Sequence, residues 1–179
     1  AAEAYARALA VASAVRRLGA RWLYKKVDST LRGNKEALNL AGHRYAGHTE
    51  LLADVCGVRG PAMMLVSDRL RVAHVTTHVS LRQACDAITV ERVRRVIGLA
   101  AESMPLLGFP TPRIVVAALN PHAGEGGLFG EEERETIAPA VEKARDCGLD
   151  VRGPLPADSL FYRALQGEFD AVVAMYHDQ

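Results

Sequence analysis

The chain has 179 residues, of which 49% are hydrophobic, and a formal net charge of +1 at pH 7. This length suits one domain with a sizeable buried core. The near-neutral charge gives neither a basic surface for nucleic acid nor an acidic tail. No apolar run approaches the roughly 18 residues that a transmembrane helix needs, so no membrane partner is expected. Three scattered cysteines without a C-x-x-C pair predict buried free thiols in a cytoplasmic protein.

The first part of the chain alternates helical and strand-like patterns. Helices are predicted over residues 1–18, 35–41 and 48–56, and a strand over 21–27. Gly47 precedes His48 and Thr49 at the start of the third helix. The free N–H groups and dipole of a helix N-terminus favour anions such as phosphate or carboxylate. The alternative is that Thr49 is an ordinary capping residue and His48 a surface group.

The remaining residues continue the alternation. Strands are predicted over 62–67, 70–75, 113–118 and 170–175, and helices over 91–104 and 131–145. The arginines of the first of these helices are interpreted as a solvated face, and Pro139 is expected at a kink or in a fresh first turn. Residues 153–159 predict a proline-ordered loop in which Asp158 or Ser159 caps a short helix. This order of elements indicates an α/β fold with a parallel sheet.

A glycine-rich stretch follows the buried strand 113–118. Asn120 and Pro121 end the strand, and His122, a glutamate and three glycines come within the next six residues. Glycines let the backbone approach a ligand closely, and open α/β sheets bind ligands at the carboxyl ends of their strands. A glycine-rich surface turn with a solvated histidine is the alternative.

Three histidines share this context. His78, His122 and His177 each lie one to four residues after a strand-like run. Because the carboxyl ends of parallel strands gather at one edge of a sheet, the three imidazoles could converge there. Such a set suits a borderline divalent ion such as Zn²⁺, Co²⁺ or Mn²⁺. Asp158 and Asp178 are acidic candidates beside it, for orienting a ligand or moving a proton.

From Lys35 onward, the sequence closely resembles the 4-hydroxythreonine-4-phosphate dehydrogenase family. The resemblance is carried by six collinear blocks over about 145 residues, at 34–38, 47–50, 70–78, 119–127, 153–158 and 174–179. It implies a partial isocitrate/isopropylmalate-dehydrogenase-like three-layer α/β/α fold, truncated at both ends. The absence of a G-x-G-x-x-G motif agrees with that fold rather than with a Rossmann domain.

The resemblance also implies an activity. Members of this family use NAD and a divalent metal (Zn, Co, Mg or Mn) to oxidise the secondary alcohol of a phosphorylated four-carbon hydroxy acid, and decarboxylation follows. The substrate expected here is 4-hydroxythreonine-4-phosphate, 4-phosphothreonate or 4-phosphoerythronate.

The family's functional residues map onto this chain as follows. The resemblance implies metal binding by His78, His122 and His177, at a site shared between the two subunits of a homodimer. It implies substrate contacts for His48 and Thr49, and it matches Asp158 and Asp178 to acidic catalytic positions. It identifies no residue that contacts NAD.

Residues 1–34 instead resemble a fragment of the four-carbon acid sugar kinase family. The block 26–34 matches the segment with which that family contacts its sugar acid. The product of such a kinase is the kind of phosphorylated acid that the dehydrogenase consumes, which favours a catabolic substrate. A kinase remnant and an inactive fusion fragment are the alternatives to an active dehydrogenase.

Overall fold

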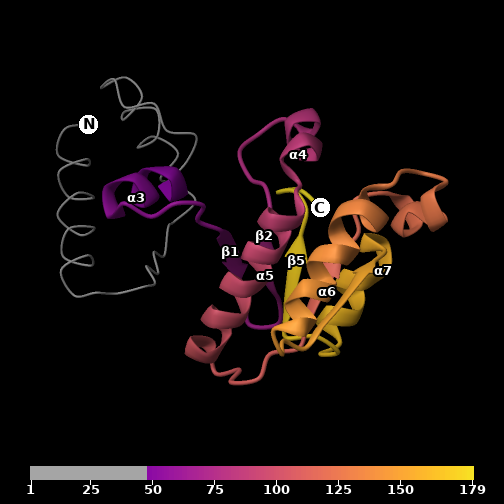
Figure 1. The fold of residues 1–179 in the computed structure, drawn as a ribbon. Helices are drawn as coiled ribbons and strands as arrows, with labels where there is room; N and C mark the ends of the chain where they lie inside the picture. Colours follow the sequence, from indigo (N-terminus) through magenta and orange to yellow (C-terminus); the bar gives the residue numbers. More distant parts are fainter. Residues whose placement is uncertain (1–47) are drawn as a thin grey trace. The chain divides into compact units, whose positions relative to one another are not determined.

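The computed structural model describes residues 48–179, which divide into two compact units after Pro61 (Figure 1). The described part of the first unit contains helix α3 (His48–Cys56), as predicted. The elements predicted over 1–18, 21–27 and 35–41 lie outside the described residues, as does the kinase-like segment 1–34. No helix among residues 48–179 has the length and apolar character needed to cross a bilayer.

The second unit is built on a five-stranded sheet with the strand order β1-β2-β5-β3-β4. The strands are β1 (Met63–Val66), β2 (Arg71–His74), β3 (Ile114–Ala117), β4 (Val151–Leu155) and β5 (Ala171–Ala174). Strand β1 pairs antiparallel to β2, and all other neighbours are parallel. The carboxyl ends of β2, β5 and β3 therefore lie side by side at one edge. The predicted α/β class is confirmed.

Helices cover both faces of this sheet. They are α5 (Val90–Ser103) and α6 (Ala138–Asp146) on one face and α7 (Ala157–Leu165) on the other. A further short helix, α4 (Leu81–Ala87), follows β2 in the chain. A 3₁₀ turn follows α5 as η2 (Met104–Leu107), the glycine-rich turn is η3 (Pro121–Gly127), and a π-helical turn, η4 (Glu133–Ile137), precedes α6. Pro139 lies in the first turn of α6, which confirms one of the two positions expected for it.

The core explains why the central strands are apolar throughout. Val116 and Val173 pack into the larger cluster, to which α5 and α6 contribute. Val115 and Val172 face the opposite way and pack with Leu160 of α7. Because both faces are covered, every residue of β3 and β5 is buried, which is the pattern of a parallel sheet between two helical layers. Each large apolar side chain buried in this way contributes roughly 1.5–3 kcal/mol.

The loop predicted over 153–159 is wrong at both ends. Residues as far as Leu155 belong to β4, and α7 begins at Ala157 after Pro156, so Asp158 lies in the first helical turn and does not cap it. Gly153 has φ +121°, and a Cβ there would lie 2.5 Å from the carbonyl oxygen of Val116. The glycine thus permits a close approach to β3, and this tertiary pairing overrides the local loop signal.

Two further expectations need correction. Arg92 is half-buried and its Nε donates a hydrogen bond to the carbonyl of Val75 at 2.8 Å, so it does not belong to a solvated face. Burial is the main reason that its pKa is lowered, and the nearby charge of Arg95 adds to this. The cysteines are free thiols as predicted, but Cys85 and Cys147 are exposed rather than buried, and Cys56 is partly exposed.

Candidate functional site

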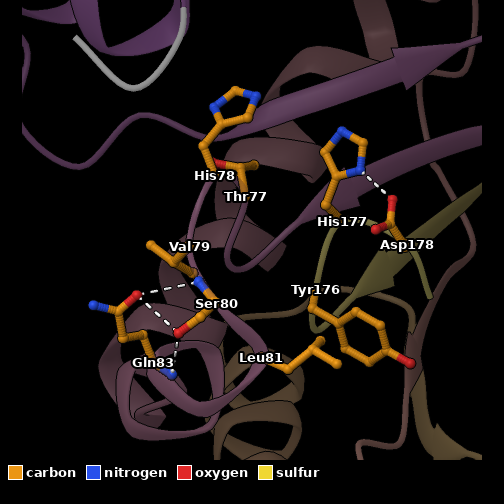
Figure 2. Close-up of a pocket in the computed structure, with 9 residues that line it drawn as sticks. All are labelled: Thr77, His78, Val79, Ser80, Leu81, Gln83, Tyr176, His177 and Asp178. Atoms are coloured by element: carbon orange, nitrogen blue, oxygen red, sulfur yellow. Dashed lines mark hydrogen bonds and ion pairs between the residues drawn. The ribbon is translucent and has the colours of Figure 1, made fainter.

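The chain segments that leave β2 and β5 stay paired beyond the strands. Val75 N–H donates to Ala174 O at 2.8 Å, and Thr76 donates to Met175 O through its N–H at 3.1 Å and its hydroxyl at 2.8 Å. These bonds carry the two segments out of the sheet together. They bring the rings of His78 and His177 to a centroid distance of 5.9 Å (Figure 2).

His177 has a carboxylate partner next to it in the chain. Its Nδ1 lies 2.7 Å from Oδ1 of Asp178, and both side chains are exposed (Figure 2). A carboxylate at Nδ1 favours the tautomer that carries its proton there. The lone pair of Nε2 is then available to a metal ion or to a substrate proton.

A third imidazole, that of His74, stacks on His177. The sequence patterns did not predict a role for it. His74 is 2% exposed, and its ring stacks on His177 with a centroid distance of 5.7 Å. Its Nδ1 lies 3.3 Å from the carbonyl of Met63, which accepts its proton. Burial, only partly offset by that carbonyl, lowers the pKa of His74. A neutral, buried ring therefore supports the exposed one, and the signal for it was a histidine inside a strand-like run.

The two exposed histidines open onto a pocket of about 510 Å³. Its lining comprises Thr77, His78, Val79, Ser80, Leu81, Gln83, Tyr176, His177 and Asp178 (Figure 2). Two imidazoles, a carboxylate and several hydroxyl groups suit a small polar molecule.

The floor of the pocket is the start of α4, a helix that the sequence analysis missed. The Ser80 side chain accepts a hydrogen bond from the Gln83 N–H at 3.3 Å, while the Gln83 side chain accepts one from the Ser80 N–H at 3.1 Å. This reciprocal capping box starts the helix. The spacing Ser-x-x-Gln was the signal that could have revealed α4.

His122 lies on the η3 turn that follows β3. Its side chain is exposed, and its ring lies 6.2 Å from that of Phe129. Strand β3 neighbours β5, so the turn leaves from the same sheet edge as the other two histidines. Among residues 48–179 of one protomer, no group of three His, Cys, Asp or Glu side chains is gathered closely enough to hold a metal ion. The structure thus brings His78 and His177 together and leaves His122 outside that pair.

The remaining predicted residues belong to other elements of the chain. Asp158 is exposed in the first turn of α7, a helix that contacts η3. His48 and Thr49 open α3 in the first unit, at the helix end where free N–H groups are expected. Their predicted roles, like the metal role of the three histidines, stay predictions.

Comparison with known proteins identifies the family. Residues 6–179 match the family described as pyridoxal phosphate biosynthetic protein PdxA. The chain belongs to the PdxA family. The resemblance deduced from the six sequence blocks is confirmed at this level. The PdxA match includes most of segment 1–34, whose likeness to four-carbon acid sugar kinases stays a prediction.

Three PdxA-type relatives illustrate the similarity. D-threonate 4-phosphate dehydrogenase of Salmonella typhimurium is 53% identical over 82% of this chain and 45% of its own length. 4-Hydroxythreonine-4-phosphate dehydrogenase of Geobacter metallireducens is 54% identical over 82% of this chain and 43% of its own. The crystal structure of 4-hydroxythreonine-4-phosphate dehydrogenase from Klebsiella pneumoniae superposes with a TM-score of 0.75 at 52% identity, covering 81% of this chain and 44% of that one. The chain spans less than half the length of these relatives.

Proposed function

We propose that this chain forms part of a cytoplasmic, NAD-dependent and divalent-metal-dependent dehydrogenase that oxidises the secondary alcohol of a phosphorylated four-carbon hydroxy acid. The observation that carries the proposal is the pairing of His78 with His177 at 5.9 Å, at the carboxyl ends of adjacent parallel strands in a PdxA-family chain. Ligands bind in this place in open α/β sheets.

The chemistry of the donors fits a borderline divalent cation. His78 and His177 are exposed imidazoles, and the carboxylate of Asp178 orients the second of them. We propose His122 as the third ligand, at a site shared between the two subunits of a homodimer. A bound Zn²⁺, Co²⁺, Mg²⁺ or Mn²⁺ would supply a Lewis acid that favours deprotonation of the alcohol and stabilises the resulting ketone.

Carboxylates of the chain provide the proton acceptors that the oxidation needs. NAD, when bound, would accept a hydride from the alcohol carbon, and the hydroxyl proton must pass to a base. Asp178 lines the pocket and is exposed, and we propose Asp178 and Asp158 as the acidic catalytic residues. Oxidation of an alcohol β to a carboxylate gives a β-keto acid, which then loses carbon dioxide.

We propose that the anionic groups of the substrate bind at the N-terminus of a helix. His48 and Thr49 at the start of α3 would contact the substrate there, because a helix N-terminus attracts phosphate and carboxylate. The names of the relatives, D-threonate 4-phosphate dehydrogenase and 4-hydroxythreonine-4-phosphate dehydrogenase, favour these two acids as substrates, and 4-phosphoerythronate is the third candidate.

Isothermal titration with Co²⁺ tests the metal site. The expected result is binding by the wild-type chain and at least a tenfold weaker affinity in each of His78→Ala, His122→Ala and His177→Ala, because each variant loses one ligand. His43→Ala, which changes a histidine outside the predicted set, is the matched control. Unchanged affinity in any one of the three ligand variants would contradict the proposed three-histidine site.

A second candidate is a four-carbon acid sugar kinase remnant, and it depends on the sequence block 26–34. This reading predicts that binding of D-threonate is abolished by Asp28→Ala or Arg32→Ala and is insensitive to His48→Ala and Thr49→Ala. The dehydrogenase proposal predicts the reverse for phosphorylated acids. An inactive fusion fragment predicts folded protein without NADH formation from any of the three phosphorylated acids.

A further inference from the structure

The turn that carries His122 has an unfavourable backbone conformation. His122, Ala123 and Glu125 all have positive φ values, of 52°, 54° and 44°, and the glycines between and after them continue the left-handed run. For a residue with a Cβ, the left-handed conformation costs roughly 1–2 kcal/mol of conformational free energy. Several such residues in succession persist only where the surrounding structure fixes them.

One buried carboxylate fixes the start of this turn. Glu133 is 5% exposed, although its side chain is polar. Its Oε1 accepts hydrogen bonds from the backbone N–H groups of Leu119 and Asn120, each at 2.7 Å, and its Oε2 accepts one from Nδ2 of Asn120 at 2.9 Å. Leu119 and Asn120 are the residues that connect β3 to the turn. The carboxylate therefore satisfies their N–H groups just where the strand ends.

The turn also closes over this carboxylate from the other side. Gly124 is buried, and a Cβ on it would lie only 2.7 Å from Oε2 of Glu133. Gly130 also leaves no room for a side chain, because a Cβ there would lie 2.4 Å from Nδ2 of Asn120. The carboxylate is thus enclosed between the exit of β3 and the middle of the turn. Movement of Glu133 would have to displace one of them.

We propose that Glu133 is a positioning residue for His122. It sets the direction in which the chain leaves β3, and through this it sets where the imidazole is presented. The inference rests on the proposed function, in which His122 is a metal ligand. The exposed Glu135 of the same π-helical turn η4 has no comparable contact with Leu119 or Asn120, so it provides a matched control.

The experiment compares Glu133→Gln and Glu133→Ala with Glu135→Ala in the full chain. Glu133→Gln keeps the volume but places an amide donor opposite the Asn120 amide, and Glu133→Ala removes all three acceptor contacts. We expect Co²⁺ affinity to fall by about 10–100-fold in Glu133→Ala, as for outer-shell partners of metal ligands, and by less in Glu133→Gln. The amides of Leu119 and Asn120 should exchange hydrogen faster in both. Glu135→Ala should match the wild type in both measurements.

The double variant His122→Ala/Glu133→Gln separates positioning from general stability. If Glu133 acts through His122, its substitution adds no further loss of Co²⁺ affinity once the imidazole is gone. A purely structural role predicts losses that add. Weak binding in His122→Ala together with wild-type binding in Glu133→Gln would overturn the inference and leave the proposed function intact. Wild-type binding in His122→Ala would overturn both the inference and the proposed function. If Glu133→Ala fails to fold, Glu133→Gln alone tests the role of Glu133.

Discussion

The side-chain amide of Gln179 donates a hydrogen bond to the carbonyl oxygen of Ala118 at 2.5 Å. Its Oε1 at the same time accepts the N–H of Met175 at 2.6 Å. Ala118 follows β3 and Met175 follows β5, so the Gln179 amide acts as one more rung between two parallel strands. The turn that this rung closes contains His177 and Asp178. The exits that carry two of the proposed metal ligands are therefore joined by a single side chain.

Gln179→Glu should weaken metal binding because it removes the N–H donor to the Ala118 carbonyl while it keeps the acceptor for the Met175 N–H. The new carboxylate would still accept from Met175 but would place a negative oxygen against the Ala118 carbonyl. We expect Co²⁺ affinity to fall about tenfold, as for an outer-shell change, and titration calorimetry measures it. Gln166→Glu, at the exposed end of α7, should bind Co²⁺ like the wild type. Equal affinities in the two variants would show that the rung has no influence on the site.

Asp178→Asn tests the partner of His177. The substitution keeps an oxygen that can accept the Nδ1 proton but removes the charge that makes the imidazole a stronger ligand. Co²⁺ affinity should fall several-fold to about tenfold, whereas the melting temperature should not change because the Asp178 side chain is 89% exposed. Asp146→Asn, on the exposed end of α6, is the control. If Asp178→Asn lowers the melting temperature as well as the Co²⁺ affinity, the role of Asp178 is structural instead.

The convergence of His78 and His177 could be predicted from the sequence. Each follows a run of apolar residues, and such runs form parallel strands whose ends meet at one edge. The prediction needed only the strand assignments, which the structure confirms for β2 and β5. It required no knowledge of side-chain conformation.

Other parts of the site left no readable pattern. The bonds from Gln179 to Ala118 and from Glu133 to Leu119 join a side chain to a backbone group 61 and 14 residues away, and no periodicity marks such pairs. His74 was hidden because a polar residue in a strand is ordinarily taken as solvent-facing. The place of His122 depends on a left-handed turn, for which the glycines are the only local signal.

Gly153→Ala should destabilise the sheet, because the residue needs both its positive φ and its missing Cβ. A Cβ would lie 2.5 Å from the carbonyl oxygen of Val116, so the β3–β4 pairing would have to shift. Backbone strain and overpacking together should cost about 3 kcal/mol, which urea denaturation measures. Gly98→Ala in α5, where a Cβ meets nothing within 4 Å, should instead stabilise the protein by roughly 0.5–1 kcal/mol. If Gly153→Ala lowers the free energy of unfolding by less than Gly98→Ala raises it, the close approach of Gly153 to Val116 does not matter for stability.

Asp170 should make stability depend on pH at the opposite edge of the sheet. Its carboxylate accepts hydrogen bonds from the backbone N–H of Arg113 at 2.8 Å, from Nε at 3.0 Å and from a terminal nitrogen at 2.8 Å. These bonds, chiefly those from the guanidinium, hold the pKa of Asp170 below its ordinary value, and burial opposes them. A carboxyl group with a lowered folded-state pKa contributes stability above its unfolded-state pKa, near 3.9. The contribution is lost as pH falls through the folded-state pKa.

Asp170→Asn is therefore expected to lower the free energy of unfolding at pH 7 by about 1.5–3 kcal/mol, the contribution typical of hydrogen bonds to a charged group. The difference from the wild type should shrink as pH falls below about 4, where the Asp170 carboxyl group of the unfolded chain becomes protonated while that of the folded chain is still ionised. Denaturation series at several pH values measure both effects, with the exposed Asp86→Asn of α4 as control. Asp170 and Arg113 precede β5 and β3, far along the strands from the histidines, so Co²⁺ affinity should not change. A difference that stays constant with pH would show that the Asp170 charge does not contribute.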